Sequence, residues 1–382
     1  MPNLYPTKAA LAVALVLALV VPAGPIQAAP LEIKTPSAIL LDAASGKVLF
    51  EQNADQRVFP ASTTKIMTLV VALEAVHAGR TSMDAPATAT PYACSFGGTQ
   101  VYASPGETFP LRDWITAVGV GSANDGSMVV AEHIAGSEEK FVEMMNQKAK
   151  ELGMTGTNFM NPHGLHHDNH YTTARDLAIL GRYATTVPEL LDYTGIYRTT
   201  FRHGTFGLDN FNKLVRTYDG CDGLKTGHTS QSGYCLVATA KRDGSRFVAV
   251  AMGATDATTR NNDVVKMLNY AFANYRSIPV ATKGQVVGLA RVYKGVQEDV
   301  EVIAPTDFGV TVEKGKYSGI KKDVIINPVV APVEKGQVLG EIVLSREGEE
   351  LARLQLVAAQ AVPRSGFFRM WGVITRAFLA GR

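Results

Sequence analysis

The sequence predicts an α/β (α+β) domain with a mainly antiparallel sheet flanked by helices, then a small all-β domain and a C-terminal amphipathic helix. Short apolar strands occur near both ends of the first 277 residues, and helical periods fill the region between them. From residue 279 to 362, Val and Ile alternate with Lys, Glu and Gly without a helical period. Domain boundaries are therefore expected at 1–28, 29–277, 278–363 and 364–382.

The expected sheet combines both ends of the first domain. Segments 37–41 and 47–51 read as a hairpin around a Gly turn. Segments 224–229, 234–240 and 246–252 read as three further strands, and their short connectors allow only antiparallel pairing. Helices are expected at 66–76, 111–118, 125–135, after Ser137 as far as Gly153, after Thr172 or Thr173, and at 260–275.

Composition excludes some classes of protein. The charged and hydrophobic fractions are 19% and 46%, which is ordinary for a globular chain. The formal net charge is +2, but the first 28 residues contribute +1 and the last 19 contribute +4, so the body is mildly acidic. Because nucleic-acid binders normally present a basic face, we expect no nucleic-acid partner.

The N-terminus resembles a secretory signal peptide. Lys8 precedes an uncharged apolar run from Ala9 to Val21, and Ala28 is a small residue at a possible cleavage point. The run is short for a membrane span, although an uncleaved anchor remains the alternative. The three cysteines, Cys94, Cys221 and Cys235, are an odd number and are expected to be free thiols.

Three short motifs follow one another along the chain. Ser62 and Lys65 form an S-x-x-K element, and positions i and i+3 share one face of a helix. Serine needs a base to become a good nucleophile, and lysine can be that base only if its pKa falls. Ser122 and Asn124 form an S-x-N element, and a Lys-Thr-Gly triplet begins at Lys225 on a predicted strand.

In this order, the three motifs match serine penicillin-binding proteins and β-lactamases. Longer stretches resemble the type-5, low-molecular-mass penicillin-binding protein family of D-alanyl-D-alanine carboxypeptidases. They are 60–68 (PASTTKIMT), 161–165 (NPHGL), 173–177 (TARDL) and 222–229 (DGLKTGHT). In one departure, the middle S-x-N residue is Ala123 where the family often has Gly. The resemblance covers nearly the whole chain after the signal segment.

The resemblance implies catalytic roles for five residues. Ser62 would attack the carbonyl between two D-alanines, and Lys65 would take its proton. Ser122 would relay a proton to the leaving amine, Asn124 would orient Lys65 and the substrate amide, and Lys225 would supply positive charge near Ser122.

The resemblance also implies substrate-binding residues. Backbone N–H groups of Ser62 and His228 would form an oxyanion hole. Thr226 and Arg260 would bind the terminal carboxylate, and Gly227 belongs to the same substrate-binding triplet. Arginine suits a carboxylate because its planar fork donates two hydrogen bonds, although Arg260 could also be a surface charge at a helix end.

The expected function is a serine-type carboxypeptidase that removes the terminal D-alanine from peptidoglycan pentapeptides ending in D-Ala-D-Ala, and that β-lactams acylate and inhibit. A D,D-endopeptidase with the same chemistry is the alternative. A class A β-lactamase would carry Glu-x-x-x-Asn between Ser122 and Lys225, and this segment has none. A non-catalytic penicillin-binding receptor should have lost Lys65 or Lys225, and both are present.

We expect no cofactor and no metal. His163, His166, His167, Asp168 and His170 form a cluster, but it lacks a clear ligand spacing.

The C-terminal tail is expected to lie on the outer face of the cytoplasmic membrane. Phe367, Trp371, Ile374 and Phe378 would form one stripe of a helix, with arginines away from it. This is the pattern of an interfacial helix on anionic lipid, and packing on the β-domain is the alternative. The protein is therefore expected to be exported and tethered.

Overall fold

The computed structural model describes residues 31–316 and 318–366. The expected signal peptide and the expected tail helix from Phe367 onward lie outside the described residues. We call residues 31–274 the N-terminal part and residues 275–366 the C-terminal β-segment. In the described residues, no helix is both long and apolar enough to cross a membrane.

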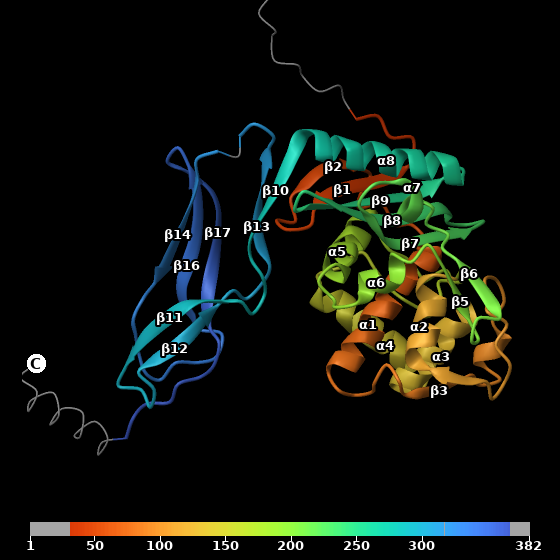
Figure 1. The fold of residues 1–382 in the computed structure, drawn as a ribbon, viewed down its shortest axis with the longest axis horizontal. Coiled ribbons are helices and arrows are strands. Elements are labelled where there is room, and N and C mark those ends of the chain that lie inside the picture. Colours follow the sequence, from red (N-terminus) through yellow and green to blue (C-terminus); the bar gives the residue numbers. More distant parts are fainter. Residues whose placement is uncertain (1–30, 317, 367–382) are drawn as a thin grey trace, which may run out of the picture. The chain divides into compact units, whose positions relative to one another are not determined.

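A five-stranded sheet forms the centre of the N-terminal part, with strand order β2-β1-β9-β8-β7 (Figure 1). All neighbouring strands pair antiparallel. The strands are β1 (Ser37–Asp42), β2 (Val48–Gln52), β7 (Cys221–Thr229), β8 (Gly233–Arg242) and β9 (Ser245–Ala254). The predicted sheet, built from the two ends of the domain, is confirmed.

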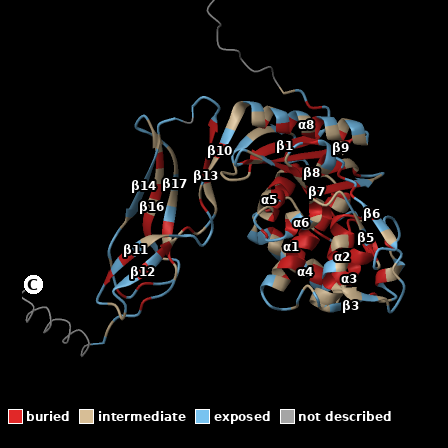
Figure 2. Ribbon diagram, in the orientation of Figure 1, coloured by how far each residue is buried: buried red, intermediate tan, exposed pale blue. Residues whose placement is uncertain are grey.

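Helices pack around this sheet and contribute many of the buried apolar residues of the N-terminal part. They are the 3-10 helix η1 (Ala61–Thr64), α1 (Lys65–His77), α2 (Leu111–Gly119), α3 (Asn124–Ala135), α4 (Glu138–Glu151), α5 (Ala174–Ala184), α6 (Leu190–Thr194), α7 (Leu214–Thr217) and α8 (Ala257–Asn274), with a short η2 (Ala93–Ser95). Figure 2 shows buried residues concentrated in α1 and the central strands. Because α1 is buried on nearly every side, its sequence lacks the polar face of a surface helix.

Side-chain caps set where several helices begin. Ser137 caps α4 by accepting from the N–H of Lys140, and Thr173 caps α5. The last helix of the N-terminal part was predicted to span 260–275, which is wrong at both ends. Asp256 accepts from the N–H of Thr259 and starts α8 earlier, while the next strand already begins at Tyr275.

Two short antiparallel strand pairs do not appear among the predicted elements. One joins β3 (Pro86–Thr88) to β4 (Thr108–Pro110), and the other joins β5 (Arg198–Phe201) to β6 (Phe206–Asp209). Strands of three or four residues show no measurable alternation of apolar and polar side chains, so periodicity could not find them.

The C-terminal β-segment contains strands and no helix among its described residues, as predicted. A six-stranded sheet has the order β14-β16-β17-β12-β11-β15, and β10 pairs with β13 separately. The strands are β10 (Tyr275–Ala281), β11 (Val286–Tyr293), β12 (Asp299–Ile303), β13 (Phe308–Glu313), β14 (Ile320–Ile326), β15 (Val329–Val330), β16 (Val338–Arg346) and β17 (Glu349–Ala358). The expected fold class is confirmed for the described residues, and the domain boundaries stay a prediction.

Residues 283–288 (KGQVVG) nearly recur as 335–340 (KGQVLG), and both segments form equivalent turns. Gly284 and Gly336 have φ of +80° and +85°, which favours glycine. Each turn is closed by a glutamine side chain that accepts from a backbone N–H three residues earlier, at 3.0 and 3.1 Å. One turn leads into β11 and the other into β16.

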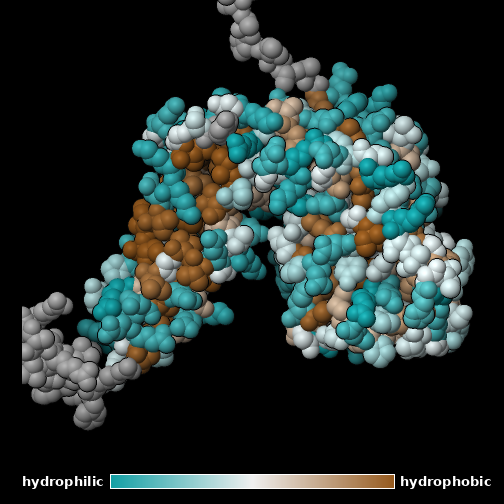
Figure 3. Space-filling view, in the orientation of Figure 1, coloured by the Kyte–Doolittle hydropathy of each residue, from teal (hydrophilic) through white to brown (hydrophobic). Residues whose placement is uncertain are grey.

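Large apolar side chains are exposed on the C-terminal β-segment. Figure 3 shows an apolar area over this segment. Its exposed large apolar residues are Val286, Leu289, Tyr293, Val324, Ile325, Val330 and Val338. An exposed apolar area of this kind is typical of a surface that contacts another surface.

Candidate active site

Ser62 lies in the 3-10 turn η1, and Lys65 is the first residue of α1. In a 3-10 turn, residues i and i+3 eclipse one another, so the two side chains point the same way. Lys65 Nζ lies 2.9 Å from Ser62 Oγ. The S-x-x-K spacing therefore produces the expected contact, although through a tighter turn than an α-helix.

The Lys65 amine is held by two further acceptors. Nζ donates to Asn124 Oδ1 at 2.8 Å and to the carbonyl oxygen of His163 at 2.6 Å. Lys65 is completely buried, and this burial, with repulsion from Lys225, holds its pKa well below the usual value. A charged lysine has three N–H groups, and Nζ also donates to Ser62 Oγ. If the amine loses the proton on the serine side, its lone pair faces the Ser62 hydroxyl while the other two acceptors keep their bonds.

The S-x-N element reaches the same place from the start of α3. Asn124 is fixed from the other side because its Nδ2 donates to the carbonyl of Gly97 at 2.7 Å. Its own N–H donates to the carbonyl of Thr99 at 2.8 Å. Ser122 is 4% exposed and has φ of +58°, a left-handed conformation that is unfavourable for a residue other than glycine. Strain of this kind is common where a side chain is aimed for function.

Lys225 comes from β7 and is also fully buried. Its Nζ has no hydrogen-bond partner within residues 31–316 and 318–366. Burial, followed by repulsion from Arg260, lowers the pKa of Lys225 to about 7. An unpartnered buried amine is costly, so this group is suited to receive an anionic or polar ligand.

Two glycines let the backbone approach Ser62 and its neighbours closely. A Cβ on Gly227 would lie 2.8 Å from the carbonyl oxygen of Pro60 and 3.0 Å from the nitrogen of Ser62. A Cβ on Gly164 would lie 2.0 Å from the carbonyl oxygen of Ala61. Both contacts are too short for any side chain, so the Lys-Thr-Gly strand and the loop after His163 press directly on η1.

The predicted carboxylate-binding residues lie beside this group, and their roles stay a prediction. Arg260 is 5% exposed, and its guanidinium contacts Asn261 Oδ1 and, at 3.4 Å, the carbonyl of Cys235. Thr226 is buried next to Lys225 on β7. The ring of His228 stacks on Tyr234 with centroids 4.1 Å apart, so its side chain lies at the exposed end of the strand.

Two contributors to the site were not found by sequence reasoning. The first is the backbone carbonyl of His163, which carries no residue-type signal. The second is Asp125, which is buried and accepts from the N–H groups of Val101 and Ala103. Its negative charge raises the pKa of Lys65 and partly opposes the larger effects of burial and Lys225.

The histidines of the predicted cluster make separate contacts. His170 is buried and contacts Thr64 Oγ1 at 2.9 Å through Nε2. His166 lies 3.3 Å from Asp168. In the described part of the chain, no group of three or more His, Cys, Asp or Glu side chains is arranged to hold a metal ion.

All three cysteines are free. In the β7–β8 hairpin, Cys235 is opposite Gly227 and Cys221 is opposite Ala240, so these two thiols lie far apart along the strands.

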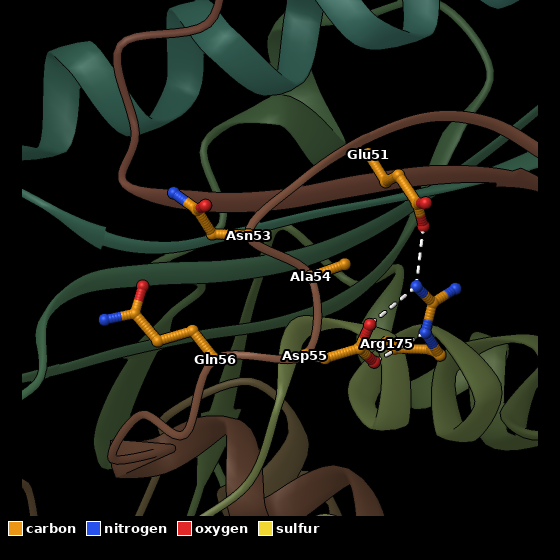
Figure 4. A pocket seen from close by; sticks show the side chains of 6 residues that line it. All are labelled: Glu51, Asn53, Ala54, Asp55, Gln56 and Arg175. Atoms are coloured by element: carbon orange, nitrogen blue, oxygen red, sulfur yellow. Dashed lines mark hydrogen bonds and ion pairs between the residues drawn. The ribbon is translucent and has the colours of Figure 1, made fainter.

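A surface pocket of about 540 Å³ is lined by none of the predicted site residues. Its lining comprises Glu51, Asn53, Ala54, Asp55, Gln56 and Arg175. Arg175 points to Glu51 and Asp55 and binds both at 2.7 Å (Figure 4). These ion pairs join α5 to β2 and to the turn after it, which gives Arg175 of the TARDL stretch a structural role.

Comparison with known proteins identifies the family. A family model described as D-alanyl-D-alanine carboxypeptidase matches residues 25–256. The chain belongs to the D-alanyl-D-alanine carboxypeptidase family. A second model, described as penicillin-binding protein 5, C-terminal domain, matches residues 275–364.

Several known proteins resemble the chain over most of its length. The D-alanyl-D-alanine carboxypeptidase DacF of Bacillus subtilis is 38% identical and covers 87% of this chain and 86% of its own. The structure of penicillin-binding protein 5 of Haemophilus influenzae is 33% identical in sequence and has a TM-score of 0.73. The match covers 88% of this chain and 100% of that protein's chain. The structure of penicillin-binding protein D2 of Listeria monocytogenes, solved in its ampicillin-bound form, is 32% identical in sequence and has a TM-score of 0.59. The match covers 63% of this chain and 99% of that protein's chain. The expected family and the expected class of serine carboxypeptidase are confirmed.

Proposed function

We propose that this carboxypeptidase works through an acyl-enzyme on Ser62, with Lys65 as the base. The observation that carries the proposal is the buried amine of Lys65, whose two N–H groups are engaged and whose remaining position faces Ser62 Oγ at 2.9 Å. Burial and Lys225 lower the pKa of Lys65, and a neutral amine can accept the serine proton.

In the first step, the Ser62 proton moves to Lys65 and Oγ bonds to the carbonyl carbon between the two D-alanines. Backbone N–H groups of Ser62 and His228 stabilise the oxyanion. The C–N bond then breaks, and the proton passes through Ser122 to the amine of the leaving D-alanine. Water finally cleaves the Ser62 ester, which releases the shortened peptide and restores the hydroxyl.

The terminal carboxylate of the substrate is the group that Lys225, Arg260 and Thr226 would bind. Lys225 Nζ is buried and lacks a partner among the described residues, and Arg260 is close enough to lower its pKa. An anion placed between two such cations would satisfy both. This pocket supports specificity for a free D-Ala-D-Ala terminus, and a β-lactam carboxylate would use the same cations.

Within the same chemistry, a D,D-endopeptidase is the second candidate. It would cleave crosslinked stems in which a longer chain follows the scissile bond. The paired cations of the proposed pocket favour the carboxypeptidase, because they match a carboxylate directly beyond the cleaved residue.

We also propose that the enzyme is exported and tethered to the outer face of the cytoplasmic membrane by residues 364–382, with residues 278–363 as a spacer after the peptidase domain at 29–277. The N–H of Ser365 donates to the carbonyl of Lys294, which places the end of the described chain beside Tyr293. Tyr293 is 54% exposed, as is Val330, its partner in the sheet. These side chains would extend the apolar contact of the tail with lipid.

The test of the proposed activity is release of D-alanine from a diacetylated L-Lys-D-Ala-D-Ala tripeptide. The wild-type protein should release it, and a Ser62→Ala protein should not. An amidated tripeptide and a crosslinked dimeric stem peptide test the pocket. Faster cleavage of the dimer than of the free acid would favour the endopeptidase instead.

A further inference from the structure

His163 is buried, and its backbone contacts the amine of Lys65. Its backbone carbonyl accepts from Lys65 Nζ, and its Nδ1 accepts from the backbone N–H of Leu165 at 3.1 Å. A neutral imidazole has one donor nitrogen and one acceptor nitrogen, so this bond places the proton on Nε2. Burial, with smaller contributions from Lys65 and His170, lowers the pKa of His163 to about 3, so the ring is neutral at physiological pH.

The Nε2–H group of His163 points to a partner that it does not quite reach. Nε2 is buried and makes no hydrogen bond among the described residues. Glu138 Oε1 lies 3.9 Å away, about 1 Å beyond a normal hydrogen bond. Buried donors are normally satisfied, so a small movement of either side chain would complete the bond.

Glu138 is itself held in place. It is the first residue of α4, directly after the Ser137 cap, and its side chain is 14% exposed. Its second carboxylate oxygen accepts from the hydroxyl of Tyr92 at 2.6 Å. The ring of Phe96 packs against both Tyr92 and His163, with centroids 5.0 and 4.7 Å away. The carboxylate therefore faces His163 from a fixed direction.

We propose that Glu138 is a positioning residue for the general base. It would hold His163 through Nε2–H, and His163 would in turn hold the carbonyl that directs the lone pair of Lys65 at Ser62. This inference rests on the proposed role of Lys65. Glu138 touches neither the substrate nor the reacting atoms.

The proposal predicts where a change at Glu138 acts. If the His163 carbonyl shifts, the Lys65 amine rotates and its lone pair leaves the Ser62 hydroxyl. The step that forms the acyl-enzyme slows, while the affinity of the preceding non-covalent complex stays the same, because the carboxylate pocket lies on β7 and α8. A misplacement of reacting groups by about 1 Å can cost about 100-fold in rate, and a smaller shift costs less.

The test is stopped-flow acylation of the full chain by a chromogenic cephalosporin, which separates the dissociation constant from the acylation rate constant. Glu138→Ala should lower the rate constant by about 10-fold or more and leave the dissociation constant unchanged. Glu139→Ala is the matched control, because Glu139 is the next residue of the same helix turn and is exposed. Equal rate constants for the two variants would overturn the proposal.

A conservative variant separates positioning from a general loss of structure. Glu138→Gln keeps an oxygen that can accept from Nε2–H, so its rate constant should return to within about three-fold of wild type. A rate as low as that of Glu138→Ala would contradict this role. If Glu138→Ala does not fold, Tyr92→Phe, which frees one end of the carboxylate, should still slow acylation, with Tyr102→Phe at an exposed ring as control.

Nuclear magnetic resonance gives a readout that does not depend on rate. Nitrogen-15 shifts of His163 should show protonated Nε2 and unprotonated Nδ1 in the wild type near neutral pH, and the Nε2–H signal should move in Glu138→Ala. A proton on Nδ1 would refute the assignment. If the Lys65→Ala protein acylates normally, the proposed role of Lys65 is wrong. If Lys65→Ala is inactive but Glu138→Ala acylates at the wild-type rate, only the inference about Glu138 is wrong.

Discussion

Replacement of Lys225 by methionine should make the folded enzyme more stable and less active. The buried Nζ has no partner among the described residues, and burial lowers its pKa from 10.5 to about 7. Methionine has a similar length and no charge to bury. The variant should lose about 100-fold in acylation, because a cation facing the developing charge is removed.

The size of the stability gain depends on pH, and its sign follows from the lowered pKa. Below pH 7, Lys225 is charged in both the folded and the unfolded protein. Burial of this charge then lowers the free energy of unfolding of the wild type by at most about 5 kcal/mol. Between pH 7 and 10.5, the unfolded lysine binds a proton that the folded lysine has lost, so the wild type becomes more stable as the pH rises. The advantage of Lys225→Met should therefore fall to about 2 kcal/mol at pH 9.

Urea unfolding at pH 6 and pH 9 checks this prediction, with fluorescence of the buried Trp114 as the signal for the N-terminal part. Lys241→Met, at an exposed position of β8, is the matched control and should show no pH-dependent gain. A Lys225→Met protein that is less stable than wild type at pH 6, or whose advantage is the same at both pH values, would refute the reasoning.

Three further outcomes are expected. Arg260→Ala should reduce the preference for the free acid over the amidated peptide by about 10-fold or more, because one charge-assisted contact is lost, and kcat/KM for both peptides measures it. Gly227→Ala should slow acylation by about 100-fold, because its Cβ would lie 2.8 Å from the backbone of Pro60 beside Ser62; stopped-flow rates close to wild type would show that the strand can move. A protein that ends near Val362 should cleave soluble peptides normally but lose binding to anionic vesicles, and sedimentation with vesicles of phosphatidylglycerol would reveal any binding that persists.

Much of the fold could be predicted because its signals are local. The three strands from Cys221 to Ala254 show apolar runs broken by short polar turns, and Ser137 and Thr173 are recognisable caps. The start of α8 was missed because Asp256 lies a turn before the apolar period begins. The hairpin β5–β6 was missed because its strands are too short for a period.

The candidate site could be predicted in its side chains but not in its backbone. The three motifs predict Ser62, Lys65 and Lys225 as site residues from their residue types and their order along the chain. The carbonyl of His163 and the close approach of Gly227 depend on tertiary packing, which short motifs do not encode. Asp125 looks like an ordinary first-turn acid of a helix, and only the structure shows it buried close enough to raise the pKa of Lys65.

The most direct test of the central claim, that Ser62 is the acylated nucleophile activated by Lys65, is intact-mass analysis after benzylpenicillin with peptide mapping of the adduct. One adduct on Ser62 is expected in the wild type, no adduct in Ser62→Ala, and very slow labelling in Lys65→Ala, because the base contributes about 100- to 10,000-fold. An adduct that persists in Ser62→Ala, or labelling of Lys65→Ala at the wild-type rate, would contradict the claim.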